Sequence, residues 1–293
     1  MKLSVNEGYF RKTRTGPRRT AKQALDICCV GGFDTVDFGL CSADPAENPV
    51  LAADGAETAR YLRDYCDTIG VAVDQTHAPY ELQNLSAAQL REQLVRSVEI
   101  SRILGAKTVV VHADTYYDKE YRFDFDTVLQ TVYECYAPMV EAAEKADVRI
   151  AMETLFEDRA PQGKRARFTS LVEELTAIVG KFNTSAVGIC WDFGHAGVVY
   201  GNGQFEKLRN VGDKVIATHV HDNMISRDLH MFPYSGQTDW ETALRTLGEI
   251  GYTGSFTFEL VYGCMPDELL ADYARLLHKT GRFMVEEIEK YRP

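Results

Sequence analysis

The chain has 293 residues, of which 45% are hydrophobic and 26% charged, a balance typical of globular proteins and unlike disordered, collagen-like or low-complexity chains. Its 32 Lys and Arg residues are outnumbered by 43 Asp and Glu residues, and the formal net charge of −11 weighs against a nucleic-acid partner. No apolar run reaches the roughly 18 residues of a membrane helix, and residues 1–19 lack the apolar region of a secretory signal. We therefore expect a cytoplasmic protein with no membrane partner.

Short β-branched runs alternate with helical patterns along the whole chain. Eight strands are predicted, at Lys2–Asn6, Thr35–Phe38, Val71–Gln75, Thr108–His112, Arg149–Glu153, Val187–Asp192, Val215–His221 and Ser255–Glu259. Successive strands begin roughly 30 to 40 residues apart, which is the size of one strand–helix unit.

Between the strands, apolar residues recur at helical spacing. The segment Leu85–Leu104 has Ser86 as its N-cap and ends before Gly105. Further helices are predicted at Phe125–Ala146, at Phe168–Val179 and from about Asp267 to Tyr291. Eight strands alternating with helices predict an α/β protein, a (β/α)8 TIM barrel that forms a single domain over residues 1–293. The competing open sheet would show a Gly-rich turn after its first strand, where the sequence instead reads EGYFRKTRTGPRR.

Side chains of metal-ligand type finish six consecutive predicted strands. They are His77, His112, Glu153, Asp192 with His195, His219 with His221, and Glu259. Taken singly, a strand-end histidine can be structural and an aspartate can cap a helix. Glu153 and Glu259 directly follow buried strands, however, where an unpaired carboxylate is costly. Because strand ends meet at one mouth of a barrel, the set predicts a metal site there.

Alternation along the seventh strand predicts that His219 and His221 point to the same face. A mixture of carboxylate oxygens and imidazoles suits Mn²⁺, Co²⁺, Zn²⁺ or Mg²⁺. The chain contains no C-x-x-C pair, which disfavours a structural zinc site built from thiolates.

Six motifs carry a resemblance to a known family: VVVHAD, AMET, WDFGHAG, THVHDN, SRDLHMFPYSGQTDW and GYTGSFTFEL. They resemble the xylose isomerase-like TIM barrels, the superfamily of sugar (phosphate) isomerases and epimerases and of the endonuclease IV class. Similarity to its ketose 3-epimerases implies one divalent ion, with Mn²⁺ as the first choice, held by Glu153, Asp192, His221 and Glu259. It also implies that Glu153 and Glu259 are acid and base in proton transfer through a metal-stabilised enediolate. The substrate is then a small sugar or sugar phosphate, bound by His112, His195 and Arg227.

The endonuclease IV class offers the alternative, a multi-metal phosphodiesterase acting at apurinic sites. Its longer set of ligands is matched by His77, His112, Glu153, Asp192, His195, His221, Asp228, His230 and Glu259. The negative net charge favours the sugar enzyme, since phosphodiester binding normally uses a broad basic face. A third hypothesis is a sugar-binding barrel without catalysis. The presence of Glu153 and Glu259 argues against it, because binding alone does not require two facing glutamates.

Two further features leave alternatives open. The basic residues Arg11, Lys12, Arg14, Arg18, Arg19 and Lys22 either recognise a phosphate or carboxylate or belong to a solvated loop. The aromatic residues Trp191, Phe193, Tyr234 and Trp240 could line the sugar pocket, although alternation with Asp192 turns Trp191 toward the helices. The long C-terminal helix could join the interface of a homo-oligomer.

Overall fold

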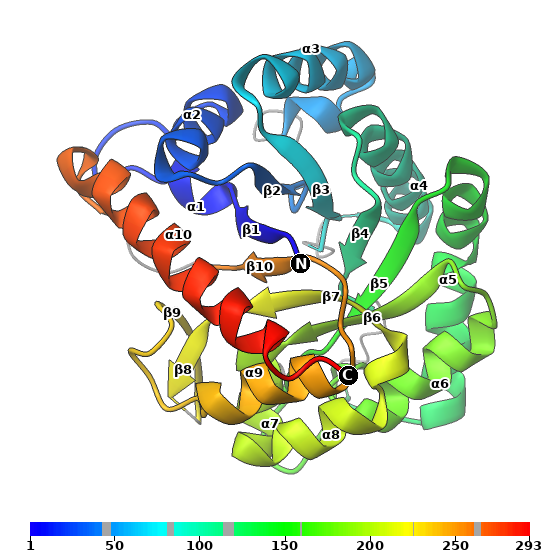
Figure 1. Ribbon diagram of the computed structural model, residues 1–293. Helices are drawn as coiled ribbons and strands as arrows, with labels where there is room; N and C mark the ends of the chain where they lie inside the picture. The colour runs from blue at the N-terminus through cyan, green and yellow to red at the C-terminus, as the bar shows by residue number, and fades with distance from the viewer. Residues whose placement is uncertain (43–47, 81–84, 114–119, 159, 225, 261–264) are drawn as a thin grey trace.

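The computed structural model describes residues 1–42, 48–80, 85–113, 120–158, 160–224, 226–260 and 265–293. Parallel strands of these ranges close into an eight-stranded barrel in the order β1-β10-β7-β6-β5-β4-β3-β2 (Figure 1). The strands are β1 Leu3–Asn6, β2 Thr35–Gly39, β3 Ala72–His77, β4 Thr108–Val111, β5 Arg149–Glu153, β6 Val187–Asp192, β7 Val215–Val220 and β10 Phe256–Phe258. The predicted (β/α)8 TIM barrel is confirmed.

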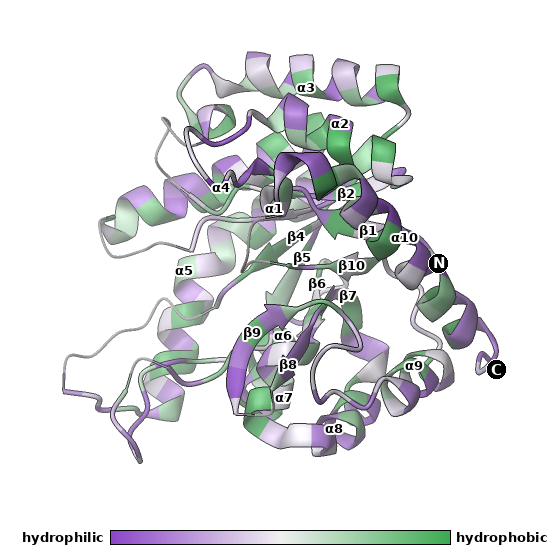
Figure 2. Cartoon of the chain, turned by 90° about the vertical axis from the view of Figure 1, so that its left-hand side faces the viewer, coloured by the Kyte–Doolittle hydropathy of each residue, from purple (hydrophilic) through white to green (hydrophobic). Residues whose placement is uncertain are grey.

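Helices surround the barrel and bury its outer face. They are α1 Gly8–Arg11, α2 Ala21–Gly31, α3 Gly55–Ile69, α4 Ala87–Leu104, α5 Phe125–Ala146, α6 Val172–Phe182, α7 Phe193–Tyr200, α8 Gln204–Asn210, α9 Trp240–Glu249 and α10 Asp267–Glu289. Figure 2 shows apolar residues on the strands and on the helix faces that cover them, with hydrophilic residues turned outward. None of the helices in the described ranges is both long and apolar enough to span a bilayer.

Local capping explains why α4 begins and ends where the sequence predicts. The Ser86 side chain accepts a hydrogen bond from the Gln89 backbone N–H, and the Gln89 side chain accepts one from the Ser86 N–H. Gly105 ends the helix in the left-handed conformation, at φ 93°, where a side chain would be strained.

The prediction for α6 was wrong at its N-terminal end. Phe168–Val179 was predicted, whereas the helix covers Val172–Phe182. Thr169 has φ 64°, outside the right-handed helical region, and its carbonyl accepts a hydrogen bond from the Leu155 N–H. Because the segment before Val172 is tied to the end of β5, the helix begins one turn later.

The strand ends differ slightly from their predicted bounds. Strand β3 extends to His77, whereas His112, His221 and Glu259 each stand just beyond their strands. No strand was predicted in the segment after β7, yet it contains an antiparallel hairpin of β8 Asp222–Met224 and β9 Arg227–Met231. This hairpin brings Asp228 and His230 toward the barrel mouth.

Inside the barrel, one layer is formed by small apolar side chains. Val110, Ala151, Cys190 and Ala217 form a buried cluster separate from the larger core between strands and helices. Trp191 belongs to the larger core and donates from Nε1 to Gln204 Oε1 of α8 at 3.3 Å. It therefore faces the helices, as the alternation with Asp192 predicted.

Candidate metal centre

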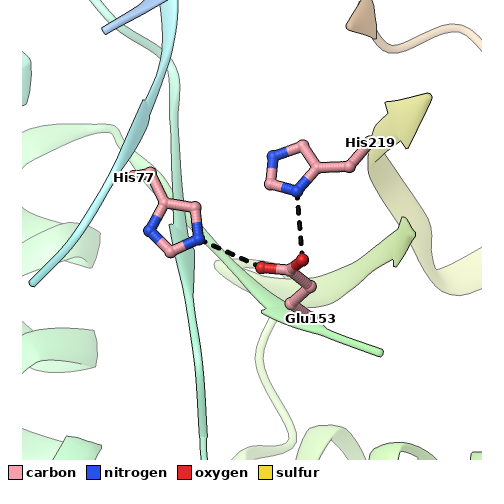
Figure 3. A group of neighbouring side chains, drawn as sticks. All are labelled: His77, Glu153 and His219. Carbon is pink, nitrogen blue, oxygen red and sulfur yellow. Dashed lines mark hydrogen bonds and ion pairs between the residues drawn. The ribbon is translucent and has the colours of Figure 1, made fainter. Parts of the chain in front are cut away.

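Glu153, at the end of β5, is one of the fully enclosed carboxylates of the barrel mouth. It is fully buried and is contacted by histidines of β3, of β7 and of the segment just after β4. Figure 3 shows two of them, His77 and His219. One oxygen, Oε2, lies 3.1 Å from His77 Nε2 and 3.0 Å from His112 Nε2. The other, Oε1, lies 3.1 Å from His219 Nδ1. Three segments distant in sequence from Glu153 thus converge on its carboxylate.

A second glutamate reaches the same histidine from another strand. Glu259 Oε2 lies 3.3 Å from His219 Nδ1, the nitrogen that also contacts Glu153. Strands β5 and β10 are separated in the barrel by β6 and β7, so the two carboxylates approach His219 from different sides. The Glu259 side chain is 12% exposed, whereas that of Glu153 is not exposed at all.

Asp192 links the sixth and seventh strands. It caps α7 by accepting the His195 backbone N–H at 2.6 Å, and its Oδ1 also lies 3.1 Å from His221 Nε2. Asp192 is therefore both a helix cap and a residue of the site, so the two interpretations of this aspartate are both correct. His219 and His221 both contact carboxylates of the mouth, as the alternation along β7 predicted.

The β8–β9 hairpin adds an outer layer of ligand-type side chains. His230 Nε2 lies 3.0 Å from Asp228 Oδ2, which is also 3.6 Å from His195 Nε2. The His230 ring stacks on that of His221, with centroids 3.8 Å apart. All nine residues of the longer ligand set are thus gathered at one end of the barrel.

The histidines and carboxylates of the mouth alter each other's ionisation. Burial by itself would raise the pKa of Glu153, but the charges of His219 and His112 hold it well below its usual value. Burial would lower the pKa of His219, yet Glu259 and Glu153 raise it to about 10. The pKa of Asp228 is lowered by its hydrogen bonds to His195 and His230, which outweigh the effect of burial.

The donor set fits a divalent cation. Ligand atoms of Glu153, Asp192, His219 and Glu259 lie within 4.8 Å of one another, and those of His221, His230 and Glu259 form a second such group. The buried Nδ1 of His221 has no hydrogen-bond partner within the described part of the chain. Buried carboxylates beside imidazoles supply the oxygen and nitrogen ligands that Mn²⁺, Co²⁺ and Zn²⁺ accept.

A cavity of about 410 Å³ opens above these residues. His112, His195 and Arg227, the residues predicted to bind substrate, line it together with Tyr80 and Phe156. The aromatic residues Trp191, Phe193, Tyr234 and Trp240 do not line it. Of the two alternatives left open by the sequence, the one in which they wall the pocket was therefore wrong, and Trp191 is a structural residue of the core. Trp240 is buried and donates to Asp222 at 3.0 Å, while Tyr234 is 51% exposed at the surface.

Several residues at the site were missed from the sequence. Asp37, in the middle of β2, is fully buried, and its Oδ2 accepts a hydrogen bond from Asn6 Nδ2 at 3.1 Å and lies 3.8 Å from His219 Nε2. Gln75 Nε2 lies 3.1 Å from the same His219 nitrogen. The inward parity of these positions was the available signal. Arg167, which lines the cavity from the long loop after β5, had none.

A family model described as "Xylose isomerase-like TIM barrel" matches residues 31–280. Among curated proteins, the uncharacterized protein y4fM of Sinorhizobium fredii is 26% identical over 169 residues, 57% of this chain and 51% of that protein. The match thus spans about half the length of this relative. The uncharacterized protein MJ1311 of Methanocaldococcus jannaschii is 27% identical over 233 residues, 75% of this chain and 76% of that protein.

Solved structures share the fold at low sequence identity. A D-tagatose 3-epimerase-like protein is 22% identical, with a TM-score of 0.74 over 98% of this chain and 99% of that one. The IolI protein, solved with a bound zinc atom, is 19% identical, with a TM-score of 0.73 over 99% of each chain. A D-psicose 3-epimerase solved in the presence of D-fructose is 15% identical, with a TM-score of 0.75 over 97% of this chain and 99% of that one.

Proposed function

The chain belongs to the xylose isomerase-like TIM barrel family, and from this premise we propose that it is a divalent-metal-dependent isomerase or epimerase of a small sugar or sugar phosphate. The observation that carries the proposal is the convergence of Glu153 and Glu259, from different sides of the mouth, on one nitrogen of His219. Structural neighbours that are ketose 3-epimerases support the same substrate class.

The residues proposed to hold the ion are Glu153, Asp192, His221 and Glu259, with Mn²⁺ as the first choice. When bound, the ion supplies Lewis acidity toward the carbonyl oxygen of a ketose. His219 lies beside three of these ligands and is the fourth member of their group in the structure. We therefore assign it to the wall of the metal site.

Proton transfer is assigned to the two glutamates. One carboxylate removes a proton from the carbon beside the carbonyl, and the other returns a proton to the opposite face, which inverts that carbon. Return to the neighbouring carbon gives aldose–ketose isomerisation. Positioned proton transfer of this kind contributes about 10²–10⁴-fold in rate. His112, His195 and Arg227 line the cavity and are proposed to hold substrate oxygens.

The test is exchange of substrate hydrogen for solvent deuterium. We expect the Mn²⁺-loaded protein to exchange the hydrogen of one carbon of D-fructose or a related ketose. Glu153→Gln and Glu259→Gln should each reduce the rate at least about 100-fold. Glu241→Gln is the matched control because Glu241 is exposed on α9, where it pairs with Arg245. Exchange at the rate of the unmodified protein in both site variants would overturn the assignment.

The endonuclease IV-like function stays as the second candidate because a specific observation favours it. His195, Asp228 and His230 form a third group whose ligand atoms lie within 4.8 Å of one another, beside the two that contain Glu259. Metal content distinguishes the candidates. One tightly bound ion per chain supports the sugar enzyme, and three ions with incision of DNA containing an abasic site support the nuclease.

We also propose that the chain forms a homodimer through α10. Leu269, Leu276 and Phe283 recur every seven residues on this helix and are 50%, 55% and 52% exposed. Residues spaced by seven lie on one face of a helix. An antiparallel pair of these helices centred on Leu276 places Leu269 against Phe283 of the second copy and Asp272 beside the second copy's Lys279. Apolar contact and opposite charges support pairing in this orientation.

A further inference from the structure

A second cavity adjoins the one above the metal centre. It encloses about 240 Å³ at the C-terminal ends of β1 and β2. Tyr80 and Glu259 line both cavities, so they form the boundary between the two. A substrate whose reacting carbons lie near Glu259 can extend past Tyr80 into this second space.

Basic side chains line the second cavity in a protein of formal net charge −11. Arg11, Lys12 and Arg18 are all members of its wall. Arg11 is neutralised, because its Nε and one terminal nitrogen each donate to a Glu7 carboxylate oxygen at 2.7 Å. Among the described residues, the only other carboxylate of the wall is Glu259, which belongs to the proposed metal site. Lys12 and Arg18 are two further cations of the wall.

The segment that carries these two cations is held in place by its own hydrogen bonds. The Arg19 backbone N–H donates to the Arg11 carbonyl at 2.8 Å, which closes the loop between them. The Arg19 side chain donates to the Phe10 carbonyl at 3.1 Å, and it also contacts the Lys12 carbonyl and Asp267. Arg19 is thus a structural residue of the loop and does not line the cavity.

We infer that the second cavity is a subsite for an oxyanion, a phosphate or a carboxylate, at the end of the substrate remote from the reacting carbons. The inference rests on the proposed function, because it is the reaction at Glu153 and Glu259 that places the substrate. An Arg guanidinium and a Lys ammonium on one wall recognise the oxygens of such a group by charge-assisted hydrogen bonds. A loop fixed before binding lowers the entropy lost when the anion is held.

The experiment compares three substrates that differ at one end: D-fructose, D-fructose 6-phosphate and D-fructuronate, which carries a carboxylate at the same carbon. Lys12→Gln, Arg18→Gln and the double variant are measured with Mn²⁺ bound. The matched control is Arg14→Gln, because Arg14 is an exposed cation of the same loop that does not line the cavity.

We expect the KM of the anionic substrate to be below that of D-fructose, and the double variant to reduce this preference at least about tenfold. Arg14→Gln should keep the preference. The substrate that shows the preference, D-fructose 6-phosphate or D-fructuronate, identifies the oxyanion as a phosphate or a carboxylate. Equal KM values for all three substrates, or a preference that persists in the double variant, would overturn the inference and leave the proposed function standing.

A binding measurement separates the inference from the proposed function. Inorganic phosphate is titrated calorimetrically into the Mn²⁺-loaded protein and into the same variants. If no ketose exchanges its hydrogen, yet phosphate binding is lost in the double variant and kept in Arg14→Gln, the subsite stands and the proposed reaction fails. Phosphate binding of equal strength in all variants contradicts the subsite.

Discussion

Gly194, in the first turn of α7, lies against the ring of His221. A methyl group at this position would be 1.8 Å from His221 Cε1 and 2.6 Å from its Nδ1. The ring therefore has to move, and with it the nitrogen that lies 3.1 Å from Asp192. We expect Gly194→Ala to weaken Mn²⁺ binding about tenfold or more, measured by calorimetry.

Gly180→Ala is the control for this prediction. Gly180 lies inside α6, and an added methyl group there meets no atom within 4 Å. Alanine is also the better helix former, so this variant should fold at least as stably as the unmodified protein. Equal Mn²⁺ affinity in the two variants would show that His221 is not a ligand.

The ionisation of His219 predicts how metal affinity depends on pH. In the metal-free protein, Glu259 and Glu153 overcome the effect of burial and raise the pKa of His219 to about 10. Protonated His219 therefore stabilises the metal-free fold below about pH 6.5, its unperturbed pKa. This contribution is lost as the pH rises toward 10. A divalent ion beside the same carboxylates competes with that proton.

We therefore expect Mn²⁺ affinity to increase by up to about tenfold per pH unit between pH 6.5 and 9, for one proton released. The difference in Tm between metal-loaded and chelator-treated protein should widen over the same interval. His219→Asn removes the competing proton and should flatten the dependence. A His219→Asn protein with the original slope would assign the proton to another group.

The sequence predicted which residue types lie at the mouth and which side chains face it. It did not predict which of these side chains contact one another. Glu153, Asp192 and Glu259 stand at or just beyond strand ends, and period-two alternation correctly predicted that His219 and His221 both face the mouth. The tilt and stagger of the closed barrel decide whether His219 or His221 contacts Glu153. In the structure it is His219. Asp37 was missed although its parity turns it inward, because the sequence does not indicate which residues an inward-facing polar side chain will contact.

At the scale of elements, Asp222 organises the hairpin that the sequence did not predict. Its buried carboxylate accepts N–H groups from Asn223 and Gly236 at 2.9 Å, Trp240 at 3.0 Å and Thr238 at 3.1 Å. The neighbouring Asn223 Oδ1 accepts the His230 backbone N–H at 3.1 Å. One carboxylate and one amide thus fix the hairpin and the segment that leads to α9.

We expect Asp222→Asn to destabilise the protein by about 2 kcal/mol, because an amide cannot accept at both of its ends. Hydrogen exchange of residues 227–240 should also become faster than in the unmodified protein. Asp239→Asn is the control, since Asp239 caps α9 at the exposed end of the same segment and asparagine is an equally good N-cap. Exchange that is unchanged in Asp222→Asn would mean that other contacts hold the hairpin.

The sequence predicted the barrel elements well because each strand and helix shows a strong pattern of apolar residues. The prediction failed where the chain departs from the strand–helix alternation. The hairpin has no Asn-Gly or Asp-Gly turn, and its strands are short, so its pairing depends on Asp222 and Asn223. The start of α6 was misplaced because Phe168 continues the apolar spacing of the helix. Its neighbour Thr169 is held in a left-handed conformation by contact with β5, which no local pattern encodes.

For the whole molecule, the two-fold symmetry of the proposed dimer allows a charge-reversal test that is specific for this interface. In an antiparallel pair of α10 helices, Asp272 of each copy lies beside Lys279 of the other. Asp272→Lys then places two lysines together at both ends of the interface, and Lys279→Asp places two aspartates together. Each variant should be monomeric at concentrations where the unmodified protein is dimeric, as measured by sedimentation velocity.

Mixing the two variants restores an opposite-charge pair at both ends. At one end the introduced lysine faces the introduced aspartate, and at the other end the unchanged Lys279 of one copy faces the unchanged Asp272 of the other. The mixture should therefore form a heterodimer, and the double variant Asp272→Lys/Lys279→Asp should dimerise alone for the same reason. Leu276→Glu removes the central apolar contact and should abolish association in every background. Each like-charge pair costs only a few tenths to about 1 kcal/mol at a surface, so the effect is clearest at low salt. A mixture that stays monomeric, while the unmodified protein is dimeric, would place the interface on another face of the barrel.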